Sequence, residues 1–275
     1  MTTRIVTAFV LILIVVMGFL FPALAWLPVL LVLLLALAAV YEIDHMFRKN
    51  GVRPIRRVST ITVVLLIWLA WEGAMSFAHL LVGLAIPAAY LFRMFRRPIE
   101  GAWRDVAATL GAIAYIGVPL ALVVELFVSG PHGQAWLLLM LTTVWATDTF
   151  ALFVGKTFGR TKLVPRLSPG KTWEGSLGGL AGALLPALLA VAFFPLAFAS
   201  TSDLELIAIV LVTSVLTQFG DLGESLLKRD AGVKDSGHVI PGHGGALDRM
   251  DSILFVAVPF SLYVHLFQPQ IFATP

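Results

Sequence analysis

Residues 135–154 read AWLLLMLTTVWATDTFALFV, and this stretch decides the fold class. A helix needs roughly 20 mostly apolar residues to cross a bilayer core, and the only charged residue in this run is Asp148. Similar runs recur along a 275-residue chain that is 59% hydrophobic, whereas soluble domains are about 45–50% apolar. The runs do not alternate as barrel strands do. We therefore predict an all-α, polytopic helical membrane protein.

The apolar runs predict about nine transmembrane helices, of which the third is the shortest. The predicted spans cover residues 5–21, 29–47, 58–71, 75–92, 106–128, 135–154, 177–198, 204–219 and 253–267. Ala23-Leu24-Ala25 resembles a signal-peptidase site and leaves cleavage after the first span open. A second apolar span follows at once, which favours an uncleaved first helix.

The 19 Lys and Arg residues predict the orientation. All of them lie at the N-terminus or in alternate loops, so the positive-inside rule places the N-terminus in the cytoplasm. It places the polar loops 155–174 and 220–251 there as well. The sequence thus divides into N-terminal transmembrane helices, 1–128, and a C-terminal catalytic membrane domain, 129–275, that holds both loops. We interpret the net charge of +3 as topology and expect no nucleic-acid partner.

Charge is concentrated in residues 221–251, DLGESLLKRDAGVKDSGHVIPGHGGALDRMD. Asp221, Glu224, Ser225 and Lys228 would share one helix face, because residues three and four apart are neighbours on a helix. Mg²⁺ commonly takes one or two carboxylates and completes its shell with water and phosphate oxygens. Carboxylates on two helix ends therefore predict a magnesium site. The alternative is that the acids only pair with nearby Lys and Arg residues. The chain has no cysteine, so thiolate metal sites are excluded.

Two further polar segments supply candidate phosphate contacts. Glycines beside His243, namely Gly244 and Gly245, allow backbone N–H groups to approach an anion, although an ordinary turn is the simpler interpretation. Lys171 and Glu174 lie in SPGKTWEG, which fails the P-loop spacing because residue 165 is proline. Their alternative role is helix N-terminal polarity at the water interface. A carboxylate at membrane depth, such as Asp148 in the sixth span, usually faces a functional cavity or a partner.

The residues between Ser225 and Asp251 resemble the signature of the phosphatidate cytidylyltransferase family, also called CDP-diacylglycerol synthases. The matching pattern is S-x-x-K-R, then K-D, then H-G-G, then D-R-x-D. WATDTFALFVG and SPGKTWEG resemble upstream segments of this family. Ala246 is a departure, because the family usually has a larger aliphatic residue there.

The resemblance implies transfer of a cytidylyl group from CTP to phosphatidate, giving CDP-diacylglycerol and pyrophosphate. It implies Mg²⁺ as cofactor, with a second cation left open, a homodimer, and an active site facing the cytoplasm from a bacterial inner membrane. The metal candidates are Asp221, Asp248, Asp148 and Glu224. The catalytic candidates are Asp221, Asp248, Lys228, Arg229, Lys234, Asp235, His243, Arg249 and Asp251. The nucleotide-binding candidates are Lys171, Glu174, Ser225, Gly244 and Gly245.

Three other classes of protein are compatible with parts of the sequence. An ion-coupled transporter would spread its essential charges near the midplane, whereas here they gather at one side. A CDP-alcohol phosphotransferase would carry an Asp-Gly pair, and the chain has none. A non-catalytic assembly protein gives no reason for the charge concentration in residues 221–251.

Overall fold

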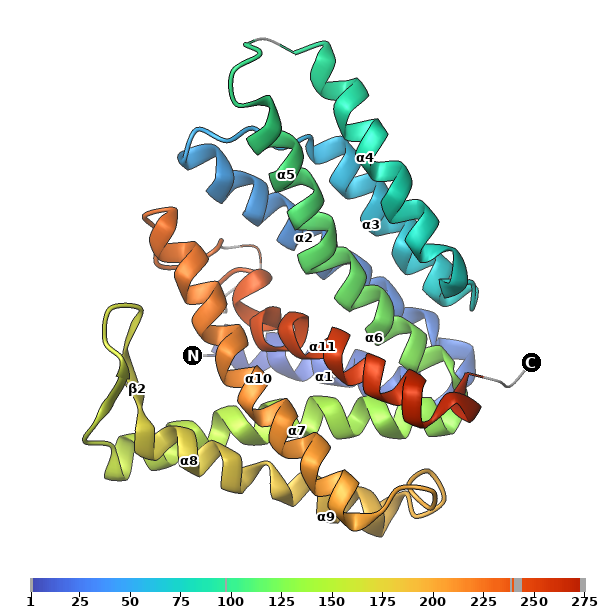
Figure 1. The fold of residues 1–275 in the computed structure, drawn as a ribbon. Coiled ribbons are helices and arrows are strands. Elements are labelled where there is room, and N and C mark those ends of the chain that lie inside the picture. Colours follow the sequence, from blue (N-terminus) through green and yellow to red (C-terminus); the bar gives the residue numbers. More distant parts are fainter. Residues whose placement is uncertain (1, 97, 238, 240–243, 273–275) are drawn as a thin grey trace. The chain divides into compact units, whose positions relative to one another are not determined.

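The computed structural model describes residues 2–96, 98–237, 239 and 244–272, most of which are helical (Figure 1). The α-helices are α1 (Thr2–Leu20), α2 (Trp26–Lys49), α3 (Arg56–Trp71), α4 (Ala78–Met94), α5 (Ala102–Ala112), α6 (Val118–Val128), α7 (Gly130–Phe158), α8 (Trp173–Gly182), α9 (Leu184–Phe193), α10 (Asp203–Asp230) and α11 (Leu247–Phe267). A π-helical turn, Ile113–Gly117, joins α5 to α6. Two short strands, β1 (Lys162–Val164) and β2 (Ser168–Thr172), form an antiparallel hairpin.

The predicted membrane class is confirmed. Among the described residues, seven helices are long and apolar enough to cross a bilayer. The other two predicted spans correspond to α1 and to α3, which has 16 residues. The seventh predicted span is two helices, α8 and α9, and its helical part ends at Phe193 rather than Phe198.

The chain forms two compact units. Unit 1 comprises Met1–Glu125 and Leu227–Met250, and unit 2 comprises Leu126–Leu226 and Asp251–Pro275. Leu227–Met250 thus groups with the N-terminal helices in unit 1.

In unit 1, helices α2, α3, α4 and α5 lie side by side (Figure 1). Their shared core is aliphatic, with Ala39 of α2, Val63 and Leu66 of α3 and Ile113 fully buried. Gly117 permits a close approach to α3, since a side chain there would lie 2.9 Å from Val63. Burying these faces against one another fixes the polar ends of α2, α4 and α5.

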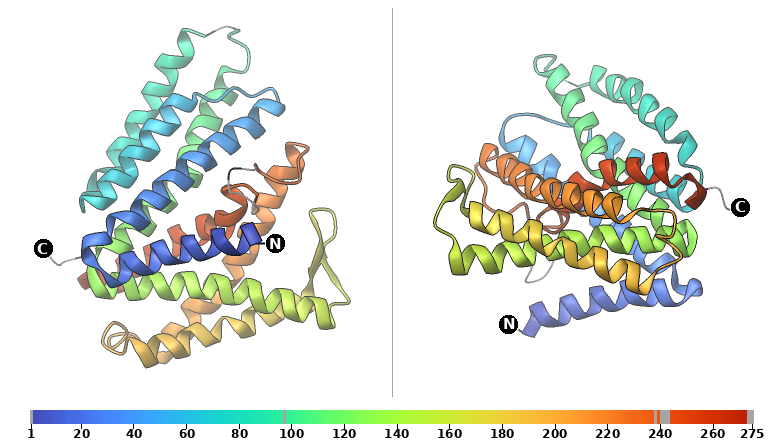
Figure 2. Two further views of the ribbon diagram at one scale, coloured as in Figure 1. Left: turned by 180° about the vertical axis from the view of Figure 1, so that it is seen from behind. Right: turned by 60° about the horizontal axis from the view of Figure 1, so that its bottom comes forward.

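In unit 2, α7 and α8 lie side by side, and the hairpin extends beyond their ends in both views of Figure 2. Glycines of α8 line the contact: a side chain at Gly175 would lie 2.8 Å from the Ala151 carbonyl oxygen, and one at Gly179 would lie 3.0 Å from that of Thr147. Small residues allow such close packing of membrane helices. Helices α10 and α11 approach closely as well, because a side chain at Gly220 would lie 2.9 Å from the Asp251 carbonyl oxygen.

Candidate active site

In unit 1, Asp248 in the first turn of α11 accepts from one ammonium group and two backbone N–H groups, and it shares the Ser236 hydroxyl with Glu42. Its Oδ1 pairs with the Nζ of Lys228 at 2.6 Å. Its Oδ2 accepts from the backbone N–H groups of Ser236 at 3.0 Å and Gly245 at 3.1 Å, and lies 2.9 Å from the Ser236 hydroxyl. The side chains of Lys228 and Asp248 are only 15% and 12% exposed. The arrangement therefore fixes one carboxylate and one ammonium group side by side.

Glu42 of α2 holds this cluster together by accepting hydrogen bonds from three of its groups. Its side chain accepts from the backbone N–H groups of Ala246 and Leu247, each at 2.9 Å, and from the Ser236 hydroxyl at 2.9 Å. The first N–H groups of a helix have no partner within the helix, so Glu42 caps the start of α11 from another helix. A side chain at Gly245 would collide with Ser236 and Glu42. That glycine therefore makes room for the carboxylate.

Glu42 and Asp44 lie near the inner end of the second predicted span, and the sequence predicts that both pair with the adjacent Arg and Lys residues. For Glu42 this prediction is wrong. Its partners lie 194 to 205 residues away in sequence, and all are hydroxyl or backbone donors. The same expectation holds for Asp44, which pairs with Arg48 at 2.8 Å and lies 3.9 Å from Arg56. A carboxylate near the end of an apolar span was the only sequence signal for Glu42.

In unit 2, Asp221 of α10 pairs with Lys171 at the end of β2. The Oδ2 of Asp221 lies 2.7 Å from the Lys171 Nζ, with the side chains 37% and 24% exposed. A reciprocal contact between Ser176 and Gln218 fixes the same two segments together. Unit 2 thus brings Asp221 and Lys171 into contact, and it also contains Asp148 of α7 and Asp251 of α11.

Glu174 holds the hairpin in place. Its carboxylate accepts from the backbone N–H groups of Arg160 and Thr161, each at 3.1 Å. Thr172 caps α8 by accepting from the Gly175 N–H at 3.1 Å. Glu174 thus fixes the backbone before the hairpin from the first turn of α8, close in sequence to Lys171.

The sequence matches the profile of the cytidylyltransferase family over residues 2–267. The chain belongs to the cytidylyltransferase family.

Curated relatives of this cytidylyltransferase-family chain carry a more specific name. It is 43% identical over 157 residues to the phosphatidate cytidylyltransferase of Haemophilus influenzae, covering 56% of this chain and 54% of that protein. It is 44% identical over 156 residues to that of Bacillus subtilis, covering 57% and 56%. It is 31% identical over 252 residues to that of Brucella abortus, covering 76% and 90%. The chain thus matches about half the length of the first two relatives and most of the third.

The remaining predicted residues of this family member fall into three groups. Glu224 is buried on α10 and Ser225 is half-buried beside it. Four residues near the Lys228–Asp248 pair are exposed: Arg229, Lys234, Asp235 and Arg249. Gly244 has a left-handed φ of 87° that favours glycine. His243 lies outside the described residues.

The chemistry of the side chains suits a hard cation, although no preformed cluster holds one. In the described part of the chain, no group of three or more Asp, Glu or His side chains is arranged to bind a metal ion. Mg²⁺ often needs only one or two carboxylates, because substrate phosphates and water complete its shell. That Asp221 and Asp248 share one cation stays a prediction.

Proposed function

We propose that this chain transfers the cytidylyl group of CTP to phosphatidate, giving CDP-diacylglycerol and pyrophosphate. Family membership gives the reaction class, and the names of the relatives suggest the acceptor. The observation that carries the proposal is the Lys228–Asp248 pair, held by Glu42 and Ser236 within the segment that carries the family motif.

The proposed step forms one P–O bond and breaks another. A phosphate oxygen of phosphatidate attacks the α-phosphorus of CTP, and pyrophosphate leaves with the electron pair of the α–β bridging bond. A phosphate monoester is already largely ionised near pH 7, so the step needs no strong general base. Positioning and charge stabilisation then supply most of the catalysis.

Two Lys–Asp pairs enter this proposal, Lys171 with Asp221 and Lys228 with Asp248. Lys171 and Lys228 would exchange their carboxylate partners for phosphate oxygens, with Arg229, Lys234 and Arg249 as further phosphate contacts. Asp221 and Asp248 would hold Mg²⁺, which supplies positive charge against the phosphates. Asp221 has only one oxygen paired with Lys171, whereas both oxygens of Asp248 have donors.

The proposal also covers location and assembly. The acceptor has two acyl chains and the donor is soluble, so the chemistry belongs at the membrane–water boundary. We propose a bacterial inner-membrane protein whose site faces the cytoplasm, acting as a homodimer.

A chelator assay tests the proposal. Purified protein in detergent is given phosphatidate, CTP and Mg²⁺, and the formation of CDP-diacylglycerol is followed with and without excess chelator. We expect product that depends on phosphatidate and disappears with chelator. Absence of product from well-folded protein with all components present would contradict the proposed reaction.

A further inference from the structure

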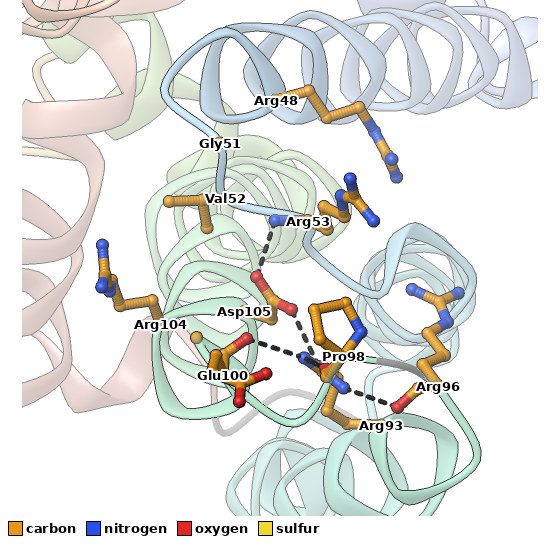
Figure 3. A pocket seen from close by; sticks show the side chains of 11 residues that line it. Arg48, Gly51, Val52, Arg53, Arg93, Arg96, Pro98, Glu100, Arg104 and Asp105 are labelled. Carbon is orange, nitrogen blue, oxygen red and sulfur yellow. Dashed lines mark hydrogen bonds and ion pairs between the residues drawn. The ribbon is translucent and has the colours of Figure 1, made fainter.

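Unit 1 holds a pocket of about 410 Å³ that shares no residue with the cluster around Asp248 (Figure 3). It lies among the end of α2, the following loop, the loop after α4 and the start of α5. Among the residues that the structure describes, five arginines line it: Arg48, Arg53, Arg93, Arg96 and Arg104. The described lining carboxylates are those of Glu100 and Asp105, so this part of the lining has an excess of three positive charges.

A buried ion pair forms the frame of this pocket. Arg93 and Asp105 are each 7% exposed, and the Arg93 Nε lies 2.8 Å from the Asp105 Oδ2. Arg93 also donates to the carbonyl oxygens of Arg96 at 3.0 Å and Pro98 at 2.6 Å. The Arg53 N–H donates to Asp105 Oδ1 at 2.7 Å. One buried network therefore fixes both loops that carry the exposed arginines.

The arginines that line the pocket carry more positive charge than the neighbouring carboxylates neutralise. Arg48 forms an ion pair with Asp44, and Arg93 forms one with Asp105. Within the residues that the structure describes, Arg53, Arg96 and Arg104 form no ion pair. Figure 3 shows that they extend from three different segments around Asp105.

The positive-inside rule explains basic loops but does not explain this architecture. Topology needs only the number of Lys and Arg residues in a loop, whereas here a buried pair shapes two loops around one space. One guanidinium group can donate two parallel hydrogen bonds to a phosphate group, which makes arginine well suited to phosphate recognition. The volume lies within the roughly 300–1,000 Å³ of small-molecule sites.

We propose that this pocket binds a phosphate-bearing anion, either a membrane phospholipid headgroup or a soluble phosphate compound. Arg53, Arg96 and Arg104 contact the phosphate, and the Arg93–Asp105 pair holds them in position. The ends of three candidate spans meet at the pocket, so a headgroup and a cytoplasmic anion both have access.

Equilibrium binding to the full purified chain tests this site. One arm uses fluorescent dioctanoyl phosphatidylglycerol, with the matching diacylglycerol as a phosphate-free control; the other uses inorganic pyrophosphate. The variants are R53Q/R96Q and R104Q. The control is R57Q, which removes an exposed arginine in the first turn of α3, outside the pocket.

We expect the wild type and R57Q to bind at least one phosphate probe equally, and R53Q/R96Q to bind it about tenfold or more weakly. R104Q should also weaken binding, and it provides a second test if the double variant does not fold. Binding of the lipid alone assigns a headgroup, and binding of pyrophosphate alone assigns a soluble ligand. Failure of the wild type to bind either probe, or equal binding by folded R53Q/R96Q and R104Q, would overturn the proposal.

Discussion

Replacing Glu42 with glutamine tests whether this residue caps α11 from another helix. The carboxylate accepts from Ser236, Ala246 and Leu247. If the glutamine oxygen replaces Oε2, it keeps the bonds to Ser236 and Leu247. The new NH₂ group then faces the Ala246 N–H, donor against donor. Ala246 is fully buried, so its N–H loses its only acceptor.

Leaving one buried donor without an acceptor costs about 1–3 kcal/mol. If that cost lowers the free energy of local opening at the start of α11, amide exchange there accelerates by about 5- to 150-fold. Hydrogen–deuterium exchange of the peptide containing Ala246 and Leu247 measures this directly. Turnover should fall in parallel, because the same network positions Asp248.

Glu72→Gln is the matched control, since it removes the same charge from an exposed residue at the end of α3. Its exchange at Ala246 and Leu247 should equal that of the wild type. Unchanged exchange in Glu42→Gln, or equal acceleration in both variants, would refute the capping role.

Three further predictions concern the neighbouring residues. Asp248→Asn should reduce turnover at least about 100-fold while leaving membrane insertion intact; wild-type turnover would remove its proposed metal role. Gly245→Ala should destabilise the protein by about 1–3 kcal/mol through collision with Ser236 and Glu42, whereas Gly223→Ala, where a side chain would approach only one ring atom at 3.9 Å, should leave thermal unfolding nearly unchanged. Lys171→Gln should raise KM for CTP about tenfold in steady-state kinetics, and an unchanged KM would place the nucleotide elsewhere.

The membrane architecture could be predicted because it depends on local composition. Long apolar runs predict spans wherever they occur, and α7 (Gly130–Phe158) contains the whole predicted span 135–154. The break between α8 and α9 was not predicted, since no charge interrupts that run. The β1–β2 hairpin was also missed, because its strands are short and lie within a polar loop.

The candidate site was predicted only where the chemistry was concentrated in sequence. The pairing of Lys228 with Asp248 lies within one polar stretch. Glu42 was missed because its partners are backbone groups about 200 residues away. The arginine pocket was missed for another reason, because membrane topology alone accounts for basic loops. The buried Arg93–Asp105 pair, which fixes the two loops around the pocket, cannot be recognised from the sequence.

The central claim is cytidylyl transfer to phosphatidate, and the position of a radioactive label in CTP tests it most directly. Purified protein with phosphatidate and Mg²⁺ should incorporate phosphorus-32 into the lipid fraction from CTP labelled at the α-phosphate. CTP labelled at the γ-phosphate should leave the lipid unlabelled and release labelled pyrophosphate. Lipid that becomes labelled with γ-labelled CTP, or that stays unlabelled with both forms of CTP, would contradict the account.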